Sequence, residues 1–477
     1  MKIFKIILLI ILTAVLGTAV FVYWLWRTGD LQKTVVQEIT NKVTNQSDQS
    51  LLTEALGFSR TRTYLVLFLN NTELRPGGGF IGAYAIMQVE KGVPHILKVE
   101  GTEILDNLGN RDFVSVPPAP LSKYLKVSRW FFRDSNWSPD FPISAQKSME
   151  LFLKQTNQTV VNRIDGVIGF TPTMIEEILK ITGPIKVDGK TFTAENFTAN
   201  LEYEVEYGYA KKGLDFASRK NILSDLASVL LQKLRFDIFK NWQRYYELSE
   251  RMFREKQLVI YSDQLAEQQF LALKNWNGQM KKTDSDYLLW VDANLGALKT
   301  DVAIERELSY QFFKDKNGRI LATAKMTFIH RGQFDWRTSR YRDYARIFVP
   351  LGSQFVSSTG AMEMEKSKAL GKIDIGEENG RAWFGTFIAV EPGKIGELAF
   401  SYYLPPAIEE SIKNGAYNLL VQKQIGTIAP KLTLGLNFDK KLVSAKPGEM
   451  SAKHGDNRYD PQTDLKEDRE FRVLLSK

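Results

Sequence analysis

The sequence contains no cysteine and only three histidines among its 477 residues. Without cysteine the chain has no disulfides, no thiolate metal sites and no cysteine nucleophile. The histidines, at positions 95, 330 and 454, are far apart and form no HExxH motif. A zinc hydrolase or a Ser–His–Asp relay is therefore unsupported. Long apolar runs are also scarce, because no segment after residue 26 is long and apolar enough to cross a membrane.

The one long uncharged run, residues 6–26, follows Lys2 and Lys5. At about 1.5 Å per residue a helix of this length spans roughly 30 Å of hydrocarbon. The two lysines place the short N-terminal end in the cytoplasm by the positive-inside bias. A cleaved signal peptide is the alternative, since residues 17–19 are small, but the apolar run continues well past them. We expect residues 1–27 to be an uncleaved transmembrane anchor, with the bulk of the chain outside the cytoplasm.

The formal net charge of +8 would ordinarily raise nucleic acid as a partner. The expected topology argues against nucleic acid, because the positively charged part of the chain would lie outside the cytoplasm. There it would face lipid head groups, undecaprenyl-type phosphates or anionic wall polymers. Lysines scattered over solvated faces are the alternative explanation, and no run of basic residues is dense enough to exclude it.

Composition and patterning divide the rest of the chain into three parts. Residues 28–60 are typical of a polar stalk, and residues 61–298 alternate strand-like with helix-like patterns, which predicts an α/β sandwich domain. Residues 299–477 carry β-rich runs without helices between them, which predicts an immunoglobulin-like β-sandwich domain with a polar tail. The first domain should contain strands at 64–69, 80–90, 93–100 and 164–170, and helices at 171–180 and 215–236. The second should contain strands at 306–314, 321–330, 344–350, 381–391, 395–403, 418–423 and 431–436.

A GxGxxG pattern occurs at Gly77, Gly79 and Gly82. A dinucleotide site requires a helix directly after such a loop, whereas a strand-like pattern follows here. We reject the dinucleotide interpretation. Two alternatives stay open: a tight glycine loop between strands, or a loop whose backbone amides approach an anion with help from Arg75.

Charged residues gather at three places that could hold a phosphate. Arg75 leaves the end of a buried strand, Arg133 and Asp134 lie in a long irregular loop, and Asp215 and Arg219 open a helix. Arginine offers a planar fork that suits phosphate oxygens, and a carboxylate can hold Mg²⁺ or accept a proton. Structural alternatives exist: Asp215 and Arg219 can form an ordinary helical pair, and Arg133 can pair with Asp134 to fix the loop.

Two other aspartates have structural interpretations. Asp140 can cap a helix that begins near Ile143, and Asp165 lies in a strand-like Asp-Gly pair. We therefore leave both outside the predicted site.

Three longer motifs, residues 69–82, 133–142 and 291–296, resemble a bacterial envelope family known as domain of unknown function 4012. That family carries no established activity. The resemblance extends over about residues 60–300 and the β-rich part.

A more remote resemblance is to the LytR–CpsA–Psr phosphotransferase family. It is carried by the passage at 164–187, an aspartate–glycine pair, short helix, glycine and strand, and by the later helix opening at 215–220. In that family arginines hold a polyprenyl pyrophosphate, aspartates hold Mg²⁺, and a glycopolymer is transferred to the wall. This sequence departs at the strand entry, where residues 78–81 replace the family's Arg-Ser-Asp-Thr. An expected Mg²⁺ carboxylate is thus missing there.

The resemblance implies a protein of the bacterial cytoplasmic membrane that binds lipid-linked pyrophosphate and transfers glycopolymer to the cell wall. Arg75, Arg133 and Arg219 would bind phosphate, and Asp134 and Asp215 would be catalytic, as Mg²⁺ ligand or base. The metal itself is unknown. The alternative is a non-catalytic envelope scaffold or adhesion protein that binds wall polymer or protein.

Overall fold

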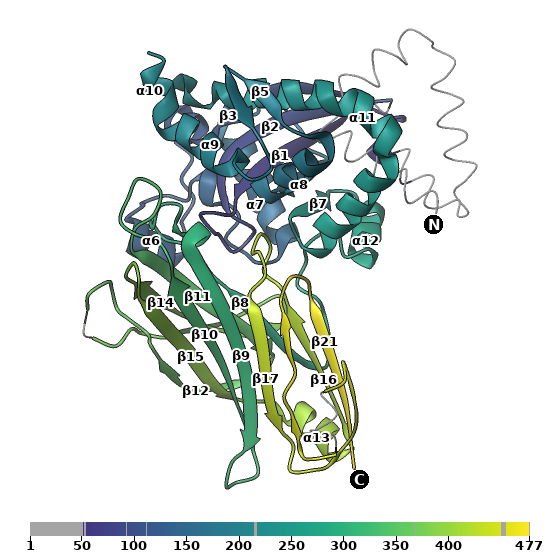
Figure 1. The fold of residues 1–477 in the computed structure, drawn as a ribbon, viewed down its shortest axis with the longest axis vertical. Coiled ribbons are helices and arrows are strands. Elements are labelled where there is room, and N and C mark those ends of the chain that lie inside the picture. The colour runs from purple at the N-terminus through teal and green to yellow at the C-terminus, as the bar shows by residue number, and fades with distance from the viewer. Residues whose placement is uncertain are drawn as a thin grey trace.

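The computed structural model describes residues 51, 54–91, 93–110, 112–213, 217–367, 369–449 and 455–476. The predicted anchor at 1–27 and most of the predicted stalk lie outside these residues. Among the residues described, no helix is long and apolar enough to cross a membrane. The fold is mixed α/β with several β-sheets, and Figure 1 shows a helix-rich part stacked on one end of a β-rich part.

The helix-rich part is built on a five-stranded sheet in the order β3-β2-β1-β4-β7. Its strands are β1 (Arg62–Asn70), β2 (Phe80–Glu90), β3 (Val93–Gly101), β4 (Gly166–Phe170) and β7 (Leu258–Ser262). β1 runs parallel to β4, and the other neighbours are antiparallel. The sequence predicted β1 to β4 correctly, because β1 and β4 are short, mainly apolar runs and β2 and β3 are β-rich runs separated by a turn.

Alternate residues of β1 face opposite sides of the sheet, and each side has its own apolar core. Leu65 and Leu67 pack against α5 (Thr102–Leu108) and α7 (Phe141–Gln155). Tyr64 and Val66 belong to the opposite core. That core is built with α8 (Pro172–Thr182), α9 (Phe197–Tyr203), α11 (Asn221–Arg254) and α12 (Leu265–Leu273). β1 is therefore buried on both faces, which explains its almost uninterrupted apolar sequence.

The β-rich part consists of two seven-stranded sheets. One has the order β12-β15-β10-β9-β17-β19, with β20 also paired to β17, and the other has the order β13-β14-β11-β8-β16-β21-β18. The first contains β9 (Ile304–Lys314), β10 (Ile320–His330), β12 (Gln354–Thr359), β15 (Ile395–Tyr403), β17 (Lys431–Asn437), β19 (Arg458–Tyr459) and β20 (Gln462–Asp464). The second contains β8 (Asp286–Val291), β11 (Tyr341–Pro350), β13 (Asp374–Glu378), β14 (Arg381–Val390), β16 (Ala416–Gln422), β18 (Leu442–Lys446) and β21 (Arg469–Leu475).

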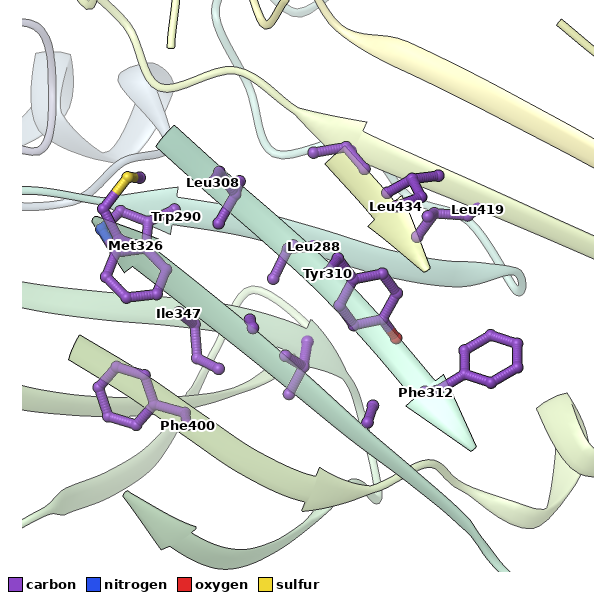
Figure 2. Packing of buried hydrophobic residues seen from close by; sticks show 14 of the residues in the cluster. Leu288, Trp290, Leu308, Tyr310, Phe312, Met326, Ile347, Phe400, Leu419 and Leu434 are labelled. Carbon is purple, nitrogen blue, oxygen red and sulfur yellow. The ribbon is translucent and has the colours of Figure 1, made fainter. Parts of the chain in front are cut away.

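One apolar core lies between these two sheets. Figure 2 shows Leu308 and Tyr310 of β9 beside Leu288 of β8 and Ile347 of β11, so both sheets contribute side chains. The period-2 alternation of β10, in which every second residue is buried, is what a strand at such a core requires.

Three elements differ from the sequence-based expectation. β8 lies within the range assigned to the α/β domain, yet it pairs with β11 and β16 of the second sheet. The strand expected after α8 is β5 (Ile185–Val187), which pairs only with β6 (Lys190–Phe192) in a separate hairpin. The β-rich part also contains a helix, α13 (Pro406–Lys413).

Candidate functional site

Arg75 lies at the junction between the two parts and is only 2% exposed. Its Nε donates to Asp134 Oδ1 at 2.9 Å, and its Nη1 donates to the backbone carbonyls of Leu74 and Asn294. Its Nη2 lies 3.4 Å from Glu73 Oε1. The guanidinium therefore has partners on every nitrogen, and one of them, Asn294, comes from the segment that follows β8.

Arg133 and Asp134 belong to the same cluster. They lie in the 3₁₀ turn η1 (Phe132–Asp134), where Asp134 is buried and Arg133 is partly exposed. Arg133 Nη1 is 3.7 Å from Asp106 Oδ2, and its guanidinium lies over the Phe131 ring. Burial raises the pKa of Asp106 to about 6, and nearby Arg133 opposes that rise. These contacts favour the structural alternative, in which ion pairs fix the loop.

Asp140 and Asp165 have the structural roles that the sequence suggested for them. Asp140 caps α7 by accepting from Ile143 N, and it also accepts from Met280 N at 2.8 Å. Asp165 is held by Arg60 at 2.7 Å and Arg163 at 2.8 Å.

The glycine loop is tightly packed. Gly77 N donates to Asn136 O, and a Cβ on Gly78 would meet Ile425 and Leu69 side-chain atoms. This agrees with a tight loop between strands rather than an open anion cradle.

A continuous junction joins the two parts around Arg75. Leu74 O accepts from Asn294 N at 3.0 Å, and Gly77 forms a β-bridge with Ile425. Gln424 Nε2 donates to Arg75 O at 3.2 Å and to Asp292 O at 2.8 Å. Residues from all three family-like motifs meet here: Arg75 contacts Asp134 and Asn294, and Gly77 N donates to Asn136 O.

Arg219 lies elsewhere, on the wall of a cavity of about 220 Å³. Apolar side chains line most of this cavity, which lies between the β1–β3 face of the first sheet and helices α8, α9 and α11. They include Val66, Met87, Val99, Phe197, Leu201, Leu226, Leu230 and Leu231. The predicted partner Asp215 lies outside the described residues.

Cations and carboxylates form a network on this cavity near the start of β2. Arg219 Nε lies 3.0 Å from Glu103 Oε1, and Lys220 Nζ lies 2.5 Å from Glu103 Oε2. Glu206 then links Arg219, at 3.7 Å, to Lys299, at 2.9 Å. Arg219, Lys220 and Lys299 thus face Glu103 and Glu206, and two further carboxylates, Glu73 and Glu202, also line the cavity.

Burial shapes the protonation of this network. Burial lowers the pKa of Lys220, and Glu103 opposes that effect. Burial alone would raise the pKa of Glu103, but Lys220 and Arg219 hold it below its ordinary value. An anion arriving here would stabilise the charged form of Lys220, because an added negative charge offsets its desolvation.

Sequence reasoning identified Arg219 but missed the rest of the network. Lys220 directly follows Arg219 and could have been included on that ground. Nothing in the sequence connects Glu103 or Lys299 with Arg219, because they come from α5 and from the segment after β8.

The described residues contain no group of three or more His, Cys, Asp or Glu that could hold a metal ion. Asp134 is engaged by Arg75 and offers no open carboxylate. Mg²⁺ stays a prediction that depends on Asp215, which is not among the described residues.

Residues 60–206 match the family described as Protein of unknown function (DUF4012). This match supports the predicted family over that segment. No protein of curated function matches the chain.

Similarities to solved structures are weak. A Streptococcus agalactiae protein is 10% identical, with 49% of this chain and 77% of that chain covered and a TM-score of 0.26. A Legionella pneumophila protein is 6% identical, with 40% and 71% covered and a TM-score of 0.24. Leukotriene A4 hydrolase from Saccharomyces cerevisiae is 6% identical, with 36% and 28% covered and a TM-score of 0.21. These scores carry no functional argument and do not confirm the resemblance to the LytR–CpsA–Psr family.

Proposed function

We propose that this chain is a membrane-anchored extracytoplasmic envelope protein whose α/β domain binds a lipid with a phosphate or pyrophosphate head. The observation that carries the proposal is the apolar cavity with Arg219, Lys220 and Lys299 on its wall. An apolar cavity takes up a hydrocarbon chain through the hydrophobic effect, and the three cations on its wall can donate hydrogen bonds to the oxygens of an anionic head. This combination is also what the LytR–CpsA–Psr resemblance implies.

The head group would bind near the start of β2, where Lys220 Nζ also donates to Gly82 O. The tail would extend along the sheet toward Met87 and Ile96, which line the same cavity. Transfer of a glycopolymer requires in addition a base or metal ligand. Asp215, close to Arg219 in sequence, is the proposed candidate.

A non-catalytic envelope scaffold is the second candidate. It is favoured by the burial of Arg75 and Asp134, which pair with each other in the junction between the two parts. In that case the cavity binds lipid without chemistry, and the β-sandwich binds wall polymer or protein.

The test is binding of farnesyl pyrophosphate, a short soluble probe, to residues 28–477 by calorimetry, with farnesol as the uncharged comparison. Arg219→Ala should weaken pyrophosphate binding about ten- to hundredfold, because a charge-assisted contact contributes roughly 1.5–3 kcal/mol. It should leave farnesol binding almost unchanged.

The cavity itself is tested with a bulky residue on α11. Ala227 lines the cavity, so Ala227→Trp should abolish binding of both probes. Ser228 is exposed on the same helix, and Ser228→Trp serves as the matched control. If neither Arg219→Ala nor Ala227→Trp alters binding, the lipid proposal fails and the scaffold is preferred.

A further inference from the structure

A second, larger cavity lies between the α/β part and the β-sandwich. It is a groove of about 520 Å³. It is lined from the α/β side by residues such as Asn71, Thr173 and Ala199, and from the sandwich side by residues such as Glu305 and Lys431. Its volume is within the range of roughly 300–1,000 Å³ that small-molecule sites occupy, and boundaries between domains are common places for such sites.

This groove lies next to the apolar cavity. Thr198 of α9 lines both. Glu202, also on α9, lines the apolar cavity and accepts from Arg337 Nε of the groove at 2.6 Å. Glu202 also accepts from the Thr72 hydroxyl, which lines the groove. A single hydrogen-bonded layer therefore separates the two cavities.

The charges of the groove differ from those of the apolar cavity. Five carboxylates and three cations line it. Each cation already has an acidic partner: Arg306 lies 2.6 Å from Asp292, Arg337 2.6 Å from Glu202 and Lys431 2.6 Å from Glu307. Asp301, Glu305 and Glu307 are also ion-paired, whereas Glu176 and Glu195 form no ion pair among the described residues. A polyanion would meet the negative charge of these two carboxylates, whereas hydroxyl groups can donate hydrogen bonds to them.

Partly exposed aromatic rings stand beside the groove. Trp336 packs edge-to-face with Tyr203 and Tyr207, at 5.7 Å between ring centroids in each case. Tyr203 ends α9, Tyr207 lies in the π-helical segment η2 (Glu204–Gly208) that follows it, and Trp336 lies in the loop after β10. α9 and that loop also supply Ala199 and Arg337 to the groove. Trp336 is 36% exposed and neighbouring Phe334 is 64% exposed. Flat aromatic faces suit the C–H face of a sugar ring, because they offer large apolar area beside polar groups.

We propose that this groove, with Trp336 at its rim, binds a neutral, hydroxyl-rich oligosaccharide. In the context of the proposed function, on which this inference rests, the saccharide is the glycan attached to the anionic lipid. The tail occupies the apolar cavity, the phosphates face the Arg219 network, and the glycan passes along the partly exposed side of the Glu202–Arg337 pair into the groove. The site thereby selects neutral glycans over polyanionic wall polymers.

The test uses full-length protein in detergent and a panel of neutral tetrasaccharides built from glucose, mannose, galactose or N-acetylglucosamine. Tetragalacturonate is the anionic comparison. At least one neutral member should bind, as followed by tryptophan fluorescence and calorimetry, and tetragalacturonate should bind more weakly. Trp336→Ala should weaken neutral binding about threefold to tenfold, and Trp336→Phe should retain most of it.

Phe313 on β9 is 50% exposed and away from the groove lining, so Phe313→Ala is the matched control and should change nothing. Thermal melting of each variant reports folding. The inference is overturned if no neutral member binds, if tetragalacturonate binds more tightly, or if Trp336→Ala behaves like Phe313→Ala. Farnesyl pyrophosphate titrated into the same samples separates the two proposals: lipid binding without saccharide binding rejects only the groove, and the reverse rejects only the lipid cavity.

Discussion

Replacing Arg75 by alanine should strongly destabilise the protein. The substitution removes the hydrogen-bonded partner of Asp134, whose side chain is only 3% exposed, and leaves that carboxylate with only Arg133, 3.9 Å away, as a counter-charge. Breaking a buried ion pair in this way costs about 3–5 kcal/mol. The Asn294 carbonyl also loses its donor. With an unfolding entropy of about 2.1 cal/mol/K per residue over 477 residues, the melting temperature should fall by about 3–5 °C.

The assay is urea and thermal unfolding followed by circular dichroism. The matched control is Arg331→Ala, because Arg331 is 62% exposed and pairs with Glu305 at 3.1 Å. An exposed pair of this kind contributes at most about 1 kcal/mol. The loss of stability in Arg75→Lys should lie between those of Arg75→Ala and Arg331→Ala, because an ammonium can approach Asp134 but cannot form the several directed hydrogen bonds of a guanidinium.

One result would refute the structural role of Arg75. If Arg75→Ala melts like Arg331→Ala while farnesyl pyrophosphate binding drops about tenfold or more, Arg75 contacts phosphate as the sequence predicted.

Two further predictions concern residues near the junction. Burial, with a contribution from nearby Lys256, lowers the pKa of Lys423 from 10.5 to about 7. Between these two pH values the unfolded chain binds more protons than the folded chain, so the free energy of unfolding should rise from pH 7 to about pH 10. In Lys423→Met this rise, measured as the urea concentration at the midpoint of unfolding, should be smaller. Gly426 has φ +80°, and a Cβ there would lie 1.9 Å from Gly78 O, so Gly426→Ala should be more destabilising than Gly380→Ala. Gly380 has φ +72° with open space around it, so equal losses of unfolding free energy in the two variants would show that the close contact is unimportant.

Sequence patterns predicted the strands well where apolar runs are bounded by turns. β2 was expected at 80–90 and is found there, and the runs at 395–403 and 431–436 correspond to β15 and β17. The long helix was placed at 215–236, whereas α11 begins at Asn221 and continues to Arg254. Its second half was missed because the helix is kinked at Asn241, where the apolar periodicity is interrupted.

β8 was missed for a different reason. All of its residues are buried, so it has no polar alternation that would mark it as a sandwich strand. Its neighbours β11 and β16 come from distant parts of the chain, and local sequence carries no information about such pairing.

The candidate site was only partly predictable. An arginine at a strand exit is a reasonable ligand for phosphate, and this pattern pointed to Arg75. The sequence could not reveal that residues 292–294 and 424–425 return to cover it. Arg219 was identified because it lies at the start of a predicted helix. The carboxylates that face it, Glu103 and Glu206, come from other elements, and only the folded structure brings them close to it.

The late position of residues 424–425 affects the order in which the chain can assemble. β1, β2 and β4 can pair as soon as about half of the chain has been made, because all strands of the first sheet precede residue 263. The glycine loop between β1 and β2 must wait for Ile425, which bridges Gly77 across the junction. Contacts of such long sequence separation form slowly, and the surface around Gly78 and Leu69 stays uncovered until then. A fragment that ends before residue 423 should therefore require chaperones or aggregate, even though it contains every strand of the five-stranded sheet.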